Sequence, residues 1–212
     1  MREYKRVYDQ KGSSMIEMLG VLTIIGMVGM GSIKIISNVY NLFIQNMIVT
    51  EARDLQKTLS DRYRFEGNYT SELFKNKECD KEGVDEVAQF ICNNKMAPFQ
   101  MCSGGKLHHR GGGDVKICEH NDKNKYYMTF YNLTNNSCAA LAQVNWYTRQ
   151  KSDVYQMSIY DGAASGDDIE PFVVDSSYSR NEATTNTFPI STIQALGACN
   201  HQDNNVIQLT FF

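Results

Sequence analysis

The pattern of apolar and polar positions changes along the chain. Residues 15–33 are almost continuously apolar and carry one charge, Glu17. From residue 34 to about residue 66 the apolar positions recur every three or four residues, and no proline interrupts residues 13–66. About 20 apolar residues in a helix cross the hydrocarbon core of a membrane, and the later spacing is typical of an amphipathic helix. The pattern predicts one helix over residues 14–66, with a transmembrane segment at about 15–33.

The amphipathic part predicts which side chains face a globular head. Its apolar positions include Ile48, Leu55 and Leu59. The polar positions, which we expect to face water, are Asn38, Asn41, Gln45, Glu51, Arg53, Lys57 and Asp61. Gly67 and Asn68 predict the end of the helix.

Residues 67–212 predict a globular head built mainly from strands. Runs rich in β-branched and aromatic residues predict strands at 125–131, 154–160, 172–174 and 206–212. Residues 85–91 predict a short helix and residues 137–144 a helical turn, whereas the rest of the Gly-, Asn- and Lys-rich stretch before residue 125 predicts loops. Strands packed against one long helix give an α+β fold with an antiparallel-sheet head.

Charge and cysteine usage indicate export. The chain of 212 residues has a net charge of −3, but residues 1–12 carry more basic than acidic side chains. The net acidity argues against a nucleic-acid-binding protein, and the basic start predicts a cytoplasmic N-terminus. All six cysteines follow residue 78, as in an exported domain that forms disulfides. Fifteen complete pairings are possible; for four of the cysteines we favour Cys79–Cys92 and Cys102–Cys118.

A secretory signal peptide is the simplest alternative for the apolar stretch. Its apolar region would span about 7–15 residues before a cleavage site, but here the stretch is longer and apolar periodicity continues beyond it. Glu17 is unusual in either case, because an acid at the centre of a bilayer costs about 2.5–3.5 kcal/mol. Glu17 either has a specific partner or lies at the membrane edge.

The residues around Glu17 favour a specific partner. In the sequence KGSSMIEMLGVLTIIG (residues 11–26) a basic leader ends at Gly12, and Glu17 is the fifth residue after it. This arrangement resembles the class III signal of type IV pilins and pseudopilins. The resemblance implies that a prepilin peptidase cuts after Gly12 and that Ser13 becomes the new N-terminus. Phe or Met is commoner than Ser at that position, so N-methylation of Ser13 stays open.

The same resemblance implies a role for Glu17 in assembly. In the family the Glu meets the terminal amine of a neighbouring subunit. A buried carboxylate and a buried ammonium each need a partner, so a slipped stack would leave both charges unpaired. We expect the pair to fix the axial register of stacked helices.

The C-terminal segment shows a second resemblance. Phe188–Ile190, then Ala198, Cys199 and Asn200, and then the final run VIQLTFF resemble the end of the type IVb pilin domain. This resemblance implies a disulfide between Cys199 and Cys138, which lies in a short helix. The short leader is more usual in type IVa pilins and pseudopilins, so the subclass stays open.

Other candidate sites carry weaker signals. Residues 106–110 form a basic loop, which we interpret as solvated rather than as a DNA-binding loop. Asp161, Asp167, Asp168 and Glu170 form an acidic loop of the kind that can bind calcium, but it lacks the EF-hand spacing. His108, His109, Cys118 and His120 match no zinc template, and no catalytic constellation emerges. We expect no metal, no cofactor and no enzymatic activity.

The sequence therefore predicts a structural subunit of a type IV pilus-like filament. Its expected partners are other copies or related pilins, the prepilin peptidase and an inner-membrane assembly platform. It would lie in the inner membrane with a periplasmic head, and then in a fibre. The alternatives are a type II secretion pseudopilin or a minor pilin that binds exported protein or DNA, and, from another class, a monomeric signal-anchored periplasmic binding protein.

Overall fold

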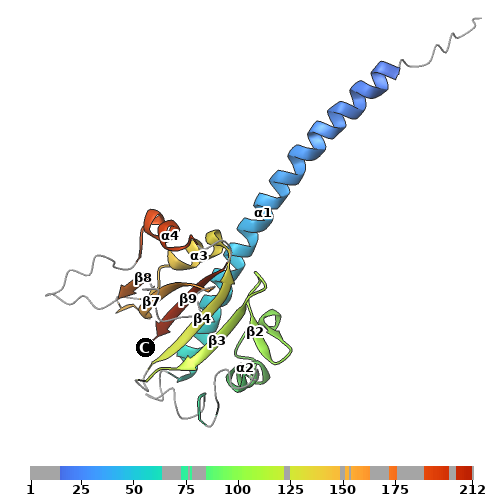
Figure 1. The fold of residues 1–212 in the computed structure, drawn as a ribbon. Coiled ribbons are helices and arrows are strands. Elements are labelled where there is room, and N and C mark those ends of the chain that lie inside the picture. Colours follow the sequence, from blue (N-terminus) through green and yellow to red (C-terminus); the bar gives the residue numbers. More distant parts are fainter. Residues whose placement is uncertain are drawn as a thin grey trace, which may run out of the picture. The chain divides into compact units, whose positions relative to one another are not determined.

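The computed structural model describes residues 15–63, 73–75, 77, 85–121, 125–148, 151–152, 154–162, 172–175, 189–200 and 204–211. The chain divides into two compact units, Met1–Leu42 and Phe43–Phe212. Helix α1 (Met15–Tyr63) contributes to both units (Figure 1). The long helix is thus present, while the predicted leader 1–12 and the predicted helix end at 64–66 lie outside the described residues.

The second unit contains an antiparallel sheet. Its strands are β1 (Cys102–Ser103), β2 (Lys106–His108), β3 (Asp114–Glu119), β4 (Tyr126–Leu133), β7 (Val154–Asp161), β8 (Phe172–Asp175) and β9 (Asn205–Phe211). Their spatial order is β1-β2-β3-β4-β9-β7-β8. The C-terminal strand β9 therefore pairs with β4 on one side and with β7 on the other (Figure 1). Strands β5 (Tyr147–Thr148) and β6 (Lys151–Ser152) form a separate hairpin.

Short helices flank the strands; they are α2 (Glu86–Asn93), the 3-10 helix η1 (Phe99–Met101), α3 (Asn135–Ala142) and α4 (Thr192–Ala198). The first turns of α2, α3 and α4 are capped by side chains. The carboxylate of Asp85 accepts the main-chain N–H of Ala88 at 2.9 Å, and Thr134 accepts that of Ser137 at 3.2 Å. Each cap satisfies a donor that the helix cannot pair internally.

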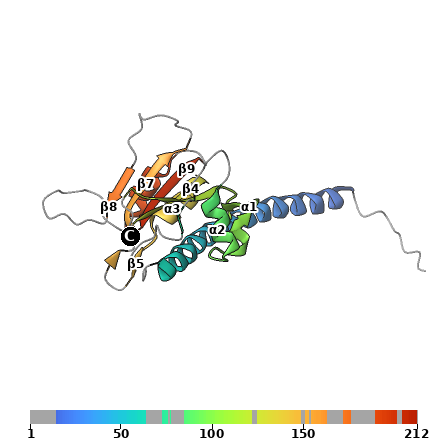
Figure 2. The ribbon, with the colours of Figure 1, turned by 90° about the horizontal axis from the view of Figure 1, so that it is seen from below.

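The core lies between one face of the sheet and the second half of α1 (Figure 2). Ile48, Ala52, Leu55, Leu59 and Tyr63 of α1 are fully buried, at the predicted spacing of three and four residues. Alternate residues of the central strands meet them, because successive side chains of a strand point to opposite faces; these are Tyr126, Met128 and Phe130 of β4 and Ile207, Leu209 and Phe211 of β9. The predicted α+β fold, with a long helix packed on an antiparallel sheet, is confirmed.

The four predicted strands and the two predicted short helices are present, but the prediction of loops before residue 125 is wrong in part. Strands β1, β2 and β3 lie there. In β3, Val115 and Ile117 are buried, whereas Lys116 and Cys118, which follow them in turn, are only partly buried. This is a two-residue alternation, but it spans only a few residues after three glycines, so the sequence pattern did not reveal it.

Helix α4 is a further element that was not predicted from the sequence. Ser191 and Gln194 form a capping box at its start: the hydroxyl of Ser191 accepts the main-chain N–H of Gln194 at 3.3 Å, and the Gln194 side chain accepts that of Ser191 at 3.0 Å. A Ser followed three residues later by Gln is a known helix start, so the signal was available in the sequence.

Candidate assembly helix and the contacts that stabilise the head

In the first unit, the described residues form an apolar helical segment whose side chains are not buried. We call residues 15–42 of α1 the exposed segment. Its large apolar side chains are between 56% and 84% exposed, and they surround the helix axis on all sides; they are Met15, Ile16, Met18, Leu19, Val21, Leu22, Ile24, Ile25, Met27, Val28, Met30, Ile33, Ile35, Ile36, Val39, Tyr40 and Leu42. A helix that is apolar all round is normally buried in protein or lipid. By length and composition it is a candidate membrane span.

Three glycines of the exposed segment have no steric explanation within the described part of the chain. Gly20, Gly26 and Gly29 would each accept a Cβ atom without meeting any heavy atom within 4 Å. Glycine inside a helix is disfavoured relative to alanine by about 1 kcal/mol in water. In membrane helices, glycines allow another helix to approach closely. The surface is therefore suited to contact with a helix of another molecule.

Of the residues predicted to govern processing and register, Glu17 lies at the start of this segment. Glu17 is in the first turn of α1 and is exposed. An acid there interacts favourably with the positive end of the helix dipole. Gly12 and Ser13 lie outside the described residues. The role of Glu17 in assembly stays a prediction.

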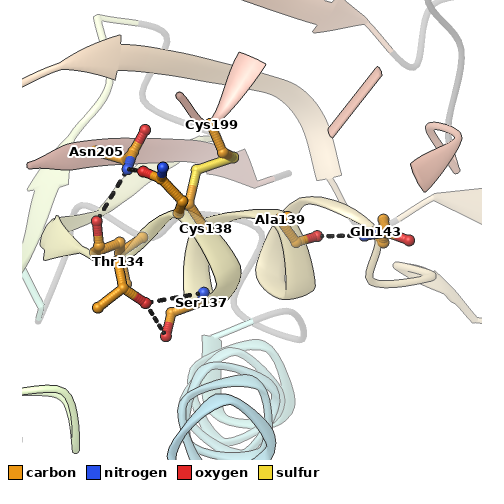
Figure 3. The surroundings of a disulfide bond; sticks show 9 residues. Thr134, Ser137, Cys138, Ala139, Gln143, Cys199 and Asn205 are labelled. Atoms are coloured by element: carbon orange, nitrogen blue, oxygen red, sulfur yellow. Dashed lines mark hydrogen bonds between the residues drawn. A yellow bond between two sulfur atoms is a disulfide. The ribbon is translucent and has the colours of Figure 1, made fainter. Parts of the chain in front are cut away.

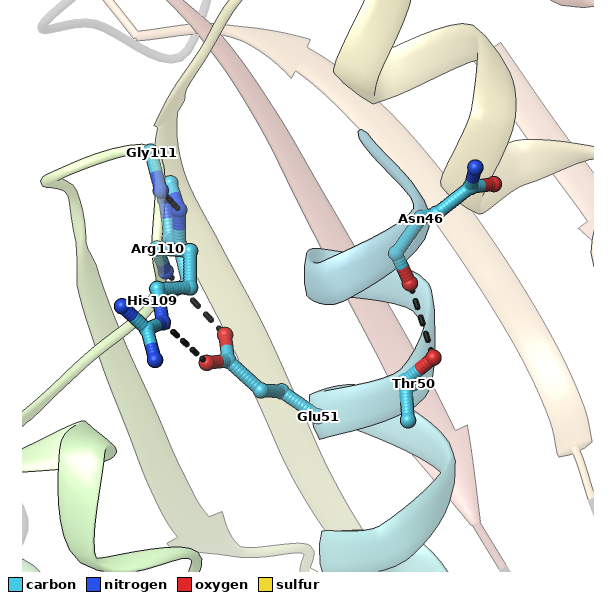
Figure 4. A network of polar contacts seen from close by, with 6 residues as sticks. All are labelled: Asn46, Thr50, Glu51, His109, Arg110 and Gly111. Carbon is cyan, nitrogen blue, oxygen red and sulfur yellow. Dashed lines mark hydrogen bonds and ion pairs between the residues drawn. The ribbon is translucent and has the colours of Figure 1, made fainter. Parts of the chain in front are cut away.

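In the head, the expectation that Glu51 faces water is wrong. Glu51 is only 3% exposed. Its carboxylate accepts the main-chain N–H of Arg110 at 3.0 Å, and the Nε atom of Arg110 lies 3.6 Å from the other carboxylate oxygen (Figure 4). Burial raises the pKa of Glu51, and the hydrogen bond and charge of Arg110 lower it part of the way back. Glu51 borders the buried stripe of α1, and a partner distant in sequence covers it.

That partner belongs to the β2–β3 loop (residues 109–113), which includes the end of the predicted basic loop. His109 is 3% exposed. Its Nδ1 atom accepts the main-chain N–H of Gly111 at 3.0 Å, so its Nε2 atom carries the proton donated to the carbonyl oxygen of Tyr131 at 2.8 Å. Burial lowers the pKa of His109, more than the Tyr131 hydrogen bond and the charge of Asp114 raise it. The interpretation of this loop as solvated is therefore wrong for His109; Arg110 remains partly exposed.

Two of the three consecutive glycines explain how the loop comes so close to β4. A Cβ atom on Gly113 would overlap the carbonyl oxygen of Tyr131, and Gly112 has a φ of +88°, which other residues rarely adopt. The turn is closed by main-chain bonds from His109 to Gly113 (2.9 Å) and from Gly112 to His109 (2.8 Å). The run of glycines thus allows the β2–β3 loop to pack closely against β4.

The predicted disulfide between Cys138 and Cys199 is confirmed (Figure 3). It joins α3 to the residue that ends α4, and the hydroxyl of Thr192 donates a hydrogen bond to Gln143 at 2.8 Å. Next to it, the fully buried side chain of Asn205 donates to the carbonyl of Leu133 at 3.1 Å and to Asn135 at 2.9 Å. These contacts connect α3, α4 and the start of β9.

The favoured pairings of the other four cysteines are wrong. Cys92 at the end of α2 is bonded to Cys102 of β1, which excludes both Cys79–Cys92 and Cys102–Cys118. Helix α2 and the β1–β2 hairpin pack together in the head, so the two cysteines meet although they belong to different elements. Cys118 is also disulfide-bonded, and Cys79 lies outside the described residues.

Of the acidic loop considered for calcium, Asp167, Asp168 and Glu170 lie outside the described residues. Within the described ranges, no three His, Cys, Asp or Glu side chains are grouped so that they would hold a metal ion. His108 instead lies 2.9 Å from the carboxylate of Asp114.

Comparison with known proteins gives a likeness among solved structures. No family model matches the chain, and no curated protein matches it. Among solved structures, TcpA, a type IV pilin from Vibrio cholerae El Tor biotype, is similar with a TM-score of 0.47 and 14% sequence identity. The likeness covers 80% of this chain and 99% of that one. At this level it does not assign the chain to a family.

Proposed function

We propose that this protein is the structural subunit of a type IV pilus-like filament and assembles through α1. The observation that carries the proposal is the exposed segment, residues 15–42, in which every large apolar side chain is exposed. Burying such a surface stabilises a chain by about 25 cal/mol per Å², so it needs lipid or protein around it. Glycines without a steric role in the chain favour other helices as the final neighbours.

The sequence motif at the start of α1 supplies the order of events. The basic leader would keep the N-terminus in the cytoplasm while the exposed segment spans the inner membrane and the head lies in the periplasm. A prepilin peptidase would cut after Gly12, and an inner-membrane assembly platform would transfer the helix from lipid into the fibre. Glu17 would then meet the new amine of Ser13 on a neighbouring copy, because both charges lose water in the fibre.

The first test is N-terminal mass analysis of protein extracted from membranes, with and without a prepilin peptidase. We expect a chain that begins at Ser13 only when the peptidase is present. A chain that keeps Met1 in both samples contradicts the proposal. It would favour the monomeric signal-anchored protein instead.

The second test addresses assembly. Glu17→Gln keeps the size of the side chain but removes its charge, so we expect processed subunits that accumulate in the membrane and form few filaments. Glu119→Gln makes the same change on an exposed carboxylate at the end of β3 and should leave filament yield unchanged. Normal filament yield from Glu17→Gln, counted by electron microscopy, would show that the charge pair does not set the register. Copy number per fibre separates a main subunit from a minor pilin or pseudopilin.

A further inference from the structure

We propose that His109, Arg110 and Glu51 form an acid-sensitive latch, in which protonation of His109 releases the β2–β3 loop from helix α1. The latch concerns the head alone, so it stands whether or not the chain forms filaments. It joins residues 59 positions apart in the sequence through the bond from the Arg110 N–H to the Glu51 carboxylate.

The closed loop has no place for a second proton on His109. Its Nδ1 atom accepts the Gly111 N–H at 3.0 Å, and its Nε2 atom lies 2.8 Å from the Tyr131 carbonyl, to which it donates. A doubly protonated ring has two donors and no acceptor. It would point an N–H at the N–H of Gly111, and that bond would be lost.

The main chain transmits this change to Arg110. His109 and Gly111 flank Arg110, whose own N–H is held by Glu51. A movement that separates Gly111 from the His109 ring therefore displaces the intervening peptide groups. Since Gly113 already approaches the Tyr131 carbonyl too closely to admit a Cβ atom, the loop cannot move further toward β4. The loop also lies against α1, where a Cβ atom on Gly111 would be 3.2 Å from the Ile48 side chain, so the remaining direction is away from both elements.

Some of the surrounding charges favour protonation of His109, and others oppose it. Asp114 of β3 favours the protonated ring, and His108 of β2 opposes it. Strand β4 contributes the Tyr131 carbonyl and the ring of Phe130, whose centroid is 6.3 Å from that of His109. Helix α2, which packs on β2 and β3, has one charged residue, Glu86, and its side chain is exposed. From α1 the facing group is Glu51.

Glu51 counteracts the opening. In the closed loop the carboxyl group of Glu51 is shielded from water, so protonation of Glu51 in acid favours the closed loop. Protonation of His109 in acid favours the open loop. Replacing Glu51 by Gln removes this opposition and keeps an oxygen for the Arg110 N–H. In Glu51→Gln, whose side chain is neutral at every pH, the latch should therefore open more completely in acid.

The test is hydrogen–deuterium exchange of the full-length protein in detergent micelles, followed in peptides that cover residues 106–116 and corrected for intrinsic exchange. In an open loop His109 has its ordinary pKa of about 6.5. Linkage of one proton then lowers protection by up to about tenfold between pH 7.5 and pH 5.5. We expect about this loss in Glu51→Gln, a smaller loss in the wild type, and none in His109→Gln, which cannot titrate.

His120→Gln is the matched control, because His120 lies beyond the far end of β3 and contacts the ring of Tyr127 instead. It should follow the wild type. The proposal is overturned if Glu51→Gln keeps full protection in acid, or if His109→Gln loses as much as the wild type. Ring ¹⁵N shifts of the wild type give a measurement free of substitutions: Nδ1 of His109 should remain unprotonated for as long as the loop keeps its protection from exchange. A protonated Nδ1 in a loop that keeps full protection would also overturn it.

Discussion

Cys138 and Cys199 are bonded across 61 residues, with Cα atoms 5.7 Å apart. The bond holds α3 against the end of α4 next to the central strand β9. Cys92 and Cys102, by contrast, enclose only 10 residues. The two disulfides therefore restrict the unfolded chain to different extents.

Removing the disulfide that closes the longer loop should cost more stability than removing the other one. In the chain-entropy model, the Cys138–Cys199 bond stabilises by about 4 kcal/mol and the Cys92–Cys102 bond by about 3 kcal/mol. We expect Cys138→Ser with Cys199→Ser to lower the unfolding free energy by more than Cys92→Ser with Cys102→Ser. Guanidinium unfolding of the full-length protein in micelles measures both, and a reversed order would contradict the entropic explanation.

The packing of α1 predicts a sharp difference between two nearby positions. Leu55 is fully buried, whereas Lys57 is exposed. Leu55→Ala removes buried methyl groups and leaves a cavity, so it should destabilise the head by about 2–5 kcal/mol. Lys57→Ala should change stability by less than about 0.5 kcal/mol. Similar losses for both variants in thermal unfolding would mean that α1 does not pack as described.

The glycines of the head predict opposite effects of the same substitution. Gly113→Ala places a methyl group on the Tyr131 carbonyl, so the loop must shift, at a cost of about 1–3 kcal/mol. Gly197→Ala in α4 meets nothing within 4 Å and should stabilise the helix by about 0.4–1 kcal/mol. Denaturant midpoints of the two variants should lie on opposite sides of the wild type. A neutral Gly113→Ala would contradict the close approach.

The pKa of Glu51 predicts an unusual pH dependence. Because burial raises this pKa above 4.5, the folded state binds the proton more tightly than the unfolded state. The stability from this group is therefore fully present below pH 4.5 and is lost as the pH rises through the folded pKa. The unfolding free energy of the wild type should rise relative to Glu51→Gln between pH 7 and pH 4.5. A fall in this difference would show that Arg110 outweighs burial.

Sequence patterns alone were enough to predict the elements whose signal lies in neighbouring residues. Three- and four-residue spacing placed Ile48, Leu55 and Leu59 on the buried side of α1, and runs rich in β-branched and aromatic residues identified β4, β7 and β9. The continuous apolar run identified the segment that the structure leaves exposed. These patterns are visible in one dimension because a helix or a strand repeats its geometry every few residues. The Cys138–Cys199 pair came from a family resemblance, not from such a pattern.

Which distant residues meet depends on the tertiary structure. It placed β9 between β4 and β7, paired Cys92 with Cys102, and buried Glu51 beneath Arg110. Periodicity classified Glu51 as water-facing because a carboxylate normally stays hydrated. What overrode this preference was a donor brought from 59 residues away by the packing of the sheet on α1. Such contacts depend on how elements pack, and the local sequence carries no record of that.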